Sequence, residues 1–316
     1  MTETTSVAVP RRWTLHGLNN GVIFSATRRG VGILPRPVSY GIGHVGTWIA
    51  WRAMATTRAA VADNLSAVFP GESRRALERR ALEMFRCYAC DVIDFLRALH
   101  ASESEAATLF HIPEPNRPLF ERLRAQGRGI ILVSGHFGNW EAGGVLCKML
   151  RLPLSVVAMT EADPTVNQIR REIRDQIGAK TIETRQSLDT ALQIRRELSA
   201  NNVVAMLIDR HYGRDRVGVT LFGRQAWFLR LPFVMGHATG APILPCTVER
   251  MSPGRFDVCP SAPVYVATDI PRDEAIAAAA QEVAAAVEER IRVHPELWYT
   301  FYRYWDAQRD AYDGLG

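Results

Sequence analysis

Residues 129–146 read GIILVSGHFGNWEAGGVL, and no other segment says as much about the architecture. The apolar run 130–133 predicts a buried strand, and Gly135 and Gly138 predict a tight turn after it. The small and apolar residues from 142 onward predict a helix. A buried strand, a turn and a helix in this order are typical of an α/β domain with a parallel sheet.

The segments that follow repeat this alternation. We predict strands at 129–134, 154–159, 180–183, 203–208, 219–222, 243–249 and 255–259, and helices at 118–127, 138–150, 164–177, 187–200, 227–240 and 271–293. The fold class is therefore α/β, with a mainly parallel, mixed sheet flanked by helices. Ligands of such sheets bind at the carboxyl ends of strands. His136 and Asp209 each follow a strand end, so both are expected to face one crevice.

The first third of the chain has a different pattern. Residues 1–10 are predicted to be disordered, and 11–112 form a helical region that is interrupted at 30–37 and 69–73. Ser73 is a suitable N-cap for a helix that extends through Phe95. Prolines 113, 115 and 118 mark the start of the α/β domain, 113–316.

Composition restricts the class of protein. The chain has 316 residues, 47% of them apolar, a formal charge of +5 and a pI of about 9.1, which favours anionic partners such as phosphates, an acidic carrier protein or acidic lipid. Five scattered cysteines, including a single C-x-x-C at 87–90, fit a reducing compartment. No P-loop, H-E-x-x-H motif or second C-x-x-C is present, so no metal is predicted. The charge alone suggests nucleic acid, which the absence of interleaved basic and aromatic strands argues against.

Two segments have two interpretations each. Residues 38–54 are too short and too interrupted for a typical spanning helix, and their tryptophans and arginines suit a membrane interface, but a buried helix explains them equally well. The glycines of 41–46 match G-x-G-x-x-G without the strand that a nucleotide site needs, so close packing is preferred. The aromatic segment 298–305 is either core or a rim that dips into a bilayer.

The turn after the first predicted strand carries the chemistry. His136 and Glu141 form a His-x4-Glu pair, in which an imidazole takes a proton near neutral pH and a carboxylate fixes its tautomer. On one ideal helix these two residues would lie about 140° apart. The pair therefore requires that His136 precedes the helix.

Together these segments resemble the late acyltransferases of lipid A biosynthesis and their relatives, which include the phosphatidylinositol mannoside acyltransferases. The resemblance covers most of the chain. It lies in Asn64-Leu65, Phe69-Pro70, Gly135 to Glu141, Asn167 with Arg174 ahead of Gly178, Asp209 and Gly213, Phe222-Gly223-Arg224, Thr239 to Pro245, and His294 to Trp298. The His-x4-Glu pair corresponds to the His-x4-Asp of glycerolipid acyltransferases.

The resemblance implies a glycerolipid acyltransferase-like fold and a membrane-associating N-terminal region. It implies transfer of a fatty acyl group from a thioester of acyl carrier protein or coenzyme A to a hydroxyl of a lipid A precursor or similar glycolipid. The location would be the cytoplasmic face of the bacterial inner membrane, reached by a peripheral or singly anchored N-terminal segment. No cofactor beyond the thioester co-substrate is implied.

Roles for individual residues follow from this expectation. His136 is the expected general base and Glu141 its orienting carboxylate. Arg174 is expected to stabilise the oxyanion or anchor a phosphate, and Asp209 to hold that arginine or the acceptor. Further substrate-binding or oxyanion candidates are the backbone N–H groups of Gly138 and Asn139, and Arg224.

Departures from the family pattern concern the acceptor. Asp209-Arg210-His211 stands where the lipid A branch has Asp-x-Asp or Asp-Gln-x, and Tyr302-Arg303-Tyr304 where it has a His-Arg-Arg-like run. Bulky residues follow Phe222-Gly223-Arg224. A phosphatidylinositol mannoside or an ornithine lipid is therefore an alternative acceptor, and a catalytically silent lipid- or carrier-binding protein is an alternative function.

Overall fold

The computed structural model describes residues 21–113, 116–159, 164–184, 188–211 and 215–307. The segment predicted to be disordered, 1–10, and Gly213 lie outside these ranges. The elements are α1 Gly21–Ile33, α2 Arg36–Ala53, α3 Ala55–Val68, α4 Arg74–Ala98, α5 Glu103–Leu109, β1 Phe110–His111, α6 Arg117–Ala125, β2 Ile130–Ser134, α7 Trp140–Met149, β3 Leu154–Ala158, α8 Pro164–Gln176, β4 Lys180–Glu183, α9 Leu188–Ser199, β5 Val203–Leu207, β6 Arg216–Leu221, β7 Arg224–Leu229, α10 Leu231–Thr239, β8 Ile243–Ser252, β9 Arg255–Pro260, α11 Arg272–Val293 and a 3₁₀ turn, η2, Pro295–Leu297.

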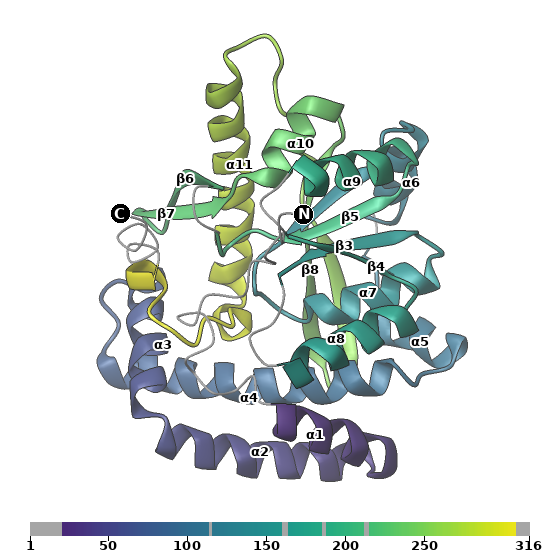
Figure 1. Cartoon of the computed structure of the whole chain (residues 1–316). Helices are drawn as coiled ribbons and strands as arrows, with labels where there is room; N and C mark the ends of the chain where they lie inside the picture. The colour runs from purple at the N-terminus through teal and green to yellow at the C-terminus, as the bar shows by residue number, and fades with distance from the viewer. Residues whose placement is uncertain (1–20, 114–115, 160–163, 185–187, 212–214, 308–316) are drawn as a thin grey trace, which may run out of the picture.

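Seven of the described strands form one sheet in the order β1-β9-β8-β2-β5-β3-β4 (Figure 1). Strands β8, β2, β5, β3 and β4 are parallel, β9 is antiparallel to β8, and β1 pairs in parallel with β9. The predicted α/β class with a mainly parallel, mixed sheet is therefore confirmed. β2 lies between β8 and β5, so the turn that follows it is located near the middle of the sheet.

Both faces of the sheet are covered, which explains why its strands are continuous apolar runs. On β2, Ile131 and Val133 pack into the core beneath α9, α10 and α11. Ile130 and Leu132 point to the opposite face, where α7 and α8 pack. The period of two thus divides one apolar strand between two cores.

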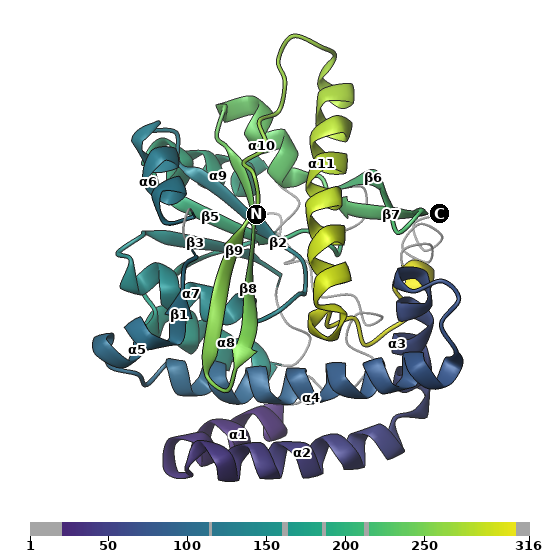
Figure 2. The same cartoon turned by 180° about the vertical axis from the view of Figure 1, so that it is seen from behind.

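The N-terminal helices lie across one end of the sheet (Figures 1 and 2). α4 is the long helix that runs beneath it, and the long β8–β9 hairpin reaches down to α4. The Ser73 hydroxyl accepts the N–H of Ala76, as predicted for an N-cap, and the helix continues past Phe95 to Ala98. α2 packs on α4 where a Cβ on Gly43 would lie 3.0 Å from Ile93 Cδ1, so one glycine of the G-x-G-x-x-G does serve close packing.

Two predictions of secondary structure were wrong. Residues 227–229 were assigned to a helix over 227–240, but they belong to β7, which pairs with β6 as a separate antiparallel hairpin. The turn uses positive φ at Phe222 and Gly223, as hairpin turns require, and the helix begins only at Leu231. β1 is a short strand inside the region that was predicted to be helical.

Candidate active site

His136 and Asp209 meet at the carboxyl edge of the sheet. β2 and β5 are neighbours, with Ser134 opposite Leu207, so the residues that follow them lie side by side. His136 Nδ1 lies 2.7 Å from Asp209 Oδ1, and the backbone N–H of His136 donates to Oδ2 at 2.8 Å. One carboxylate therefore holds both the ring and the backbone of the histidine. The two residues thus meet at one edge of the sheet, but of the pair His136 lines the cavity described below, while Asp209 is buried behind it.

The turn that carries His136 depends on Gly138. Its φ is +60°, and a Cβ at this position would lie 2.2 Å from the carbonyl oxygen of Val248. The backbone can therefore pass close to β8 only with glycine. Asn139 then caps α7, since its Oδ1 accepts the N–H of Ala142. His136 thus lies before the helix, as the predicted pairing required.

The backbone N–H groups of this turn have other partners than a substrate. The N–H of Gly138 donates to Leu297 O at 2.8 Å, and that of Asn139 to Val248 O at 2.7 Å. Both were candidate oxyanion donors, and this part of the prediction was wrong. The reason is that the turn is a connection between β2, β8 and η2, and it uses its donors to hold them together.

Burial and charge set the protonation of the pair. Burial first, and then the guanidinium of Arg210, lower the pKa of His136, which outweighs the opposite effect of Asp209. Burial favours a higher pKa for Asp209, but His136, Arg210 and the two hydrogen bonds from His136 outweigh it, so its pKa is lowered. The stable state is a neutral imidazole beside an ionised carboxylate. Nδ1–H then donates to Asp209, and Nε2 is the nitrogen left for a substrate.

Glu141 contacts a different residue from the one predicted. Its carboxylate forms an ion pair with the guanidinium of Arg170 on α8. The carboxylate that contacts His136 is that of Asp209, so the orienting role assigned to Glu141 falls to Asp209. The reason is that α7 starts at Trp140 and directs Glu141 toward α8, away from β5. His136 instead has the ring of Trp140 beside it, edge-on at 5.2 Å between centroids.

A cavity of about 260 Å³ opens at this pair and continues between α7, α8 and the sheet. Its polar wall includes His136, Glu141 and three arginines, Arg170, Arg174 and Arg210. Ser134 also lines it, with a buried hydroxyl that has no hydrogen-bond partner among the described residues. The remaining wall is mostly aliphatic and aromatic. A small polar mouth and a long apolar interior suit an amphiphilic ligand whose reacting group stays at the mouth.

The other predicted site residues divide between this cavity and the exterior. Arg174 lines the cavity, as expected for a residue that contacts substrate. Arg224 does not: it is exposed at the start of β7, and its guanidinium lies over the ring of Trp305, 4.9 Å from the centroid. It is absent from the cavity wall because it lies at the opposite end of β7 from Leu229, which does line the cavity. The aromatic segment that contains Trp305 is core, with Trp298 and Tyr304 almost completely buried.

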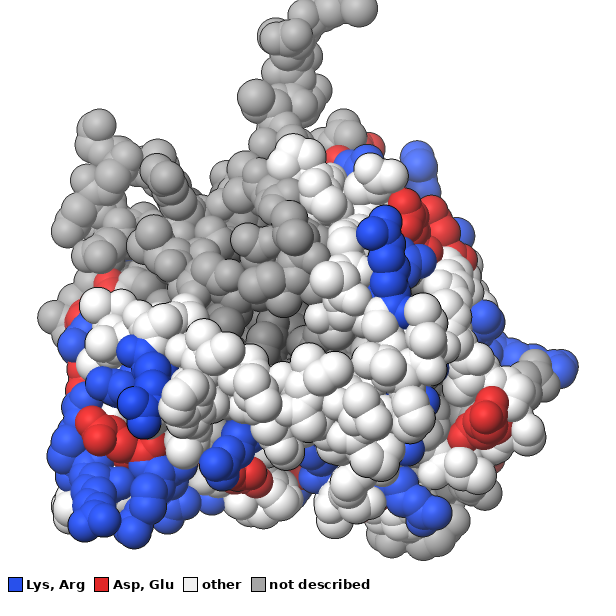
Figure 3. Space-filling model, turned by 90° about the horizontal axis from the view of Figure 1, so that it is seen from below, with Lys and Arg blue, Asp and Glu red and all other residues white. Residues whose placement is uncertain are grey.

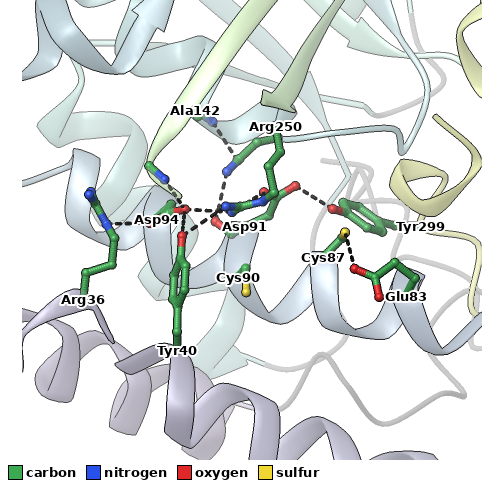
Figure 4. A network of polar contacts seen from close by, with 12 residues as sticks. Arg36, Tyr40, Glu83, Cys87, Cys90, Asp91, Asp94, Ala142, Arg250 and Tyr299 are labelled. Carbon is green, nitrogen blue, oxygen red and sulfur yellow. Dashed lines mark hydrogen bonds and ion pairs between the residues drawn. The ribbon is translucent and has the colours of Figure 1, made fainter. Parts of the chain in front are cut away.

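Tyr299 joins the histidine turn to a buried polar network (Figure 4). Its N–H donates to the carbonyl oxygen of His136 at 2.8 Å, and its hydroxyl donates to Asp91 Oδ2 at 2.5 Å. The guanidinium of Arg250 lies between Asp91 and Asp94, 2.6 and 2.8 Å from their oxygens. Burial raises the pKa of Asp91 to about 6, although Arg250 and the tyrosine hydroxyl lower it.

The same network reaches the outermost helix. The hydroxyl of Tyr40 on α2 bonds to Asp94 and to Arg250, and Arg36 lies 3.1 Å from Asp94 (Figure 4). The side chain of Asn139 adds a second link between the histidine turn and this network, since it donates to the carbonyl oxygen of Asp91. The histidine turn is therefore tied to α2, α4 and the β8–β9 hairpin through bonds that low dielectric strengthens.

Sequence reasoning missed some of these residues. The sequence pattern assigned no role to Arg210 or Tyr299. A signal existed for the His136–Asp209 pair, since both follow strand ends in a parallel sheet. No local pattern marks Tyr299, because its partner Asp91 is 208 positions away.

Comparison with known proteins assigns the family. The model of the bacterial lipid A biosynthesis acyltransferases matches residues 2–307. The chain belongs to this family. It is also 26% identical over 186 residues to a phosphatidylinositol mannoside acyltransferase of Mycobacterium tuberculosis strain H37Rv, and equally to that of strain CDC 1551. The alignment covers 58% of this chain and 56% of each relative, so it spans little more than half the length of these proteins.

Proposed function

We propose that this protein transfers a fatty acyl group from an acyl thioester, carried by acyl carrier protein or coenzyme A, to a hydroxyl of a membrane glycolipid. Family membership supports acyl transfer. The observation that carries the proposal is the His136–Asp209 pair at the mouth of an apolar cavity, because it joins a base to a space for an alkyl tail. A lipid A precursor is the acceptor that the family suggests, and a phosphatidylinositol mannoside the one that the aligned relative suggests.

In this mechanism Nε2 of His136 takes the proton of the acceptor hydroxyl while that oxygen attacks the thioester carbonyl carbon. Asp209 stabilises the resulting imidazolium. The carbon–sulfur bond then breaks, the imidazolium returns the proton to the thiolate, and an ester and a free thiol leave. General-base catalysis of this kind contributes about 10²–10⁴ to the rate.

The negative charge on the carbonyl oxygen needs donors other than the turn's backbone. Arg174 and Arg210 line the same cavity, and the Ser134 hydroxyl is buried in its wall. A fixed donor in a site without water stabilises such an oxyanion by several kcal/mol, about 3–4 when one donor is removed from a well-formed hole. Glu141, by fixing Arg170, would set the charge at the mouth where an anionic substrate enters.

Membrane association is part of the proposal, and α2 supplies the surface. Val38, Ile42, Val45 and Ile49 recur at helical spacing and are 47–61% exposed, and Trp48 is 56% exposed. In Figure 3 a broad band without acidic or basic side chains crosses this face, with Lys and Arg at its margins. No helix within the described ranges has the length and hydropathy of a membrane span. A helix that lies in the interface of an anionic bilayer fits these facts.

The test combines a thiol-release assay with lipid analysis. Purified protein is given acyl carrier protein or coenzyme A thioesters, with and without a lipid A precursor or a phosphatidylinositol mannoside. Thiol release that requires lipid, and a product heavier by one acyl group, are expected. His136→Ala should lower kcat by about 10²–10⁴ with an unchanged melting temperature. A folded variant with near-normal turnover would remove His136 from the mechanism, and thiol release without any lipid would favour a thioesterase.

A further inference from the structure

The apolar part of the cavity follows α7 over almost its whole length. Trp140 and Glu141 line the mouth, and Cys147 and Leu150 line the far end. Ten residues of helix correspond to roughly 15 Å. β3 forms the opposite wall and runs toward the mouth, so Leu154 lies deeper than Val156 and Ala158. The cavity is therefore a channel whose depth can be read along α7.

Two adjacent glycines lie within this helix where it lines the channel. Gly143 and Gly144 lie in the interior of α7, where each costs about 0.5–1 kcal/mol relative to alanine. Neither has a positive φ, so backbone conformation does not require glycine at either position. What distinguishes Gly144 is close packing against two other residues of the channel wall: a Cβ there would lie 2.6 Å from Ile177 Cδ1 and 3.8 Å from Leu154 Cδ2, so a larger side chain would push these residues or itself into the channel.

We propose that Gly144, opposite Ile177 and Leu154, sets the longest acyl chain that the enzyme accepts. The inference rests on the proposed function, which places the thioester at His136 and the alkyl tail in the channel. With no side chain at Gly144, Ile177 packs directly against α7, and the channel beside Gly144, Ile177 and Leu154 stays open as far as the chamber that Phe120, Cys147 and Leu152 line. Burial raises the pKa of the Cys147 thiol to about 12, so it stays protonated and acts as an apolar wall.

A side chain at Gly144 would divide the channel into an outer and an inner part. Short acyl chains need only the outer part and keep their contacts. Long chains lose the inner part, and each methylene without a place costs about 0.8 kcal/mol or more. Selectivity should therefore change in one direction, toward shorter chains, with the chemistry at His136 unchanged.

The experiment compares acyl thioesters from octanoyl to stearoyl as competing donors. Gly144→Leu should lower kcat/KM for palmitoyl and stearoyl by about 100-fold relative to octanoyl, with octanoyl turnover within a few-fold of the natural protein. Adding Ile177→Ala to Gly144→Leu should return part of the long-chain activity, because it restores the missing space. Gly32→Leu puts the same side chain on a helical glycine with open space around it and should leave the profile unchanged.

A smaller substitution and a binding measurement also test the role of Gly144. If Gly144→Leu does not fold, Gly144→Ala should show the same shift to a smaller degree, because Ile177 can rotate away. Thermal stabilisation by free octanoate and palmitate gives a readout without turnover, and the folded variant should lose only the effect of palmitate. An equal loss for all chain lengths, or no loss, would overturn the assignment of Gly144. A natural protein that turns over no thioester would overturn the proposed function instead.

Discussion

At the scale of single residues, two carboxylates compete for the role of partner to His136. Glu141 is the partner in the local His-x4-Glu pattern, whereas Asp209 is the partner by contact. The two can be separated because Asp209 contacts the imidazole and partly offsets the lowering of its pKa by burial, whereas Glu141 is paired with Arg170.

The pH dependence of activity gives the test. The lowered pKa of His136 places the acid limb of kcat/KM below its ordinary 6.5, so activity should rise with pH and be level at neutrality. Asp209→Asn should lower kcat by about 10²–10⁴ and move the limb of the remaining activity further toward acid, because the carboxylate that favours the imidazolium is gone. Glu141→Gln should leave the limb in place and raise KM, through the loss of its ion pair with Arg170. A shift of the limb in Glu141→Gln, with none in Asp209→Asn, would restore Glu141 as the orienting group.

At the scale of elements, α2 has two faces with different tasks. Its inner face packs on α4 and joins the polar network through Tyr40 and Arg36. Its outer face exposes apolar side chains that no described element covers. A helix with one packed and one bare apolar face is expected to lie flat on a lipid surface.

Charge placed on the outer face of α2 should release the protein from lipid. Ile42→Asp and Ile49→Asp should each weaken binding to anionic vesicles about tenfold, since a half-exposed isoleucine that inserts is worth about 1–2 kcal/mol. Leu188 on α9 is 75% exposed and distant from α2, so Leu188→Asp is the matched control and should bind normally. Vesicle co-sedimentation measures the difference. Equal binding of all variants would place the lipid contact elsewhere.

At the scale of the whole molecule, Arg250 is the residue on which the N-terminal helices, the β8–β9 hairpin and the histidine turn converge. It lies between two buried carboxylates on α4, and one of these accepts the hydroxyl of Tyr299. Breaking a buried ion pair on one side typically costs about 3–5 kcal/mol, because the remaining charge is left without a partner.

Arg250→Met should therefore lower the free energy of unfolding by about 3–5 kcal/mol at pH 7, measured by urea denaturation. The direction in which the free energy of unfolding changes with pH follows from the pKa of Asp91. Its pKa in the folded protein, about 6, exceeds the ordinary 3.8, so the folded state binds more protons and gains stability as pH falls through this range. Without Arg250 that gain grows, so the deficit of the variant should shrink toward pH 5. The double variant Arg250→Met with Asp91→Asn should recover part of the loss at pH 7. A stability deficit of Arg250→Met that changes neither with pH nor with the substitution of Asp91 would refute the role of the pair.

The sequence by itself determined the periodic features: the α/β class, the order of most strands and helices, the N-cap at Ser73, and the turn that places His136 ahead of α7. These follow from rules of period two, period 3.6 and glycine position, which act over a few residues. These rules did not predict the second strand of the β6–β7 hairpin, because its apolar residues Trp227-Phe228-Leu229 also fit the start of a helix.

Tertiary structure alone decided which groups meet. The partner of His136 comes from the neighbouring strand β5, 73 positions away, while the carboxylate five positions away turns toward Arg170. The N–H groups of Gly138 and Asn139 donate to carbonyl oxygens of η2 and β8, and Gly144 lies where the side chain of Ile177 packs directly against α7. Such contacts depend on strand order and on the crossing of helices. A linear pattern does not contain that information, because many sequences share the pattern and differ in what packs against it.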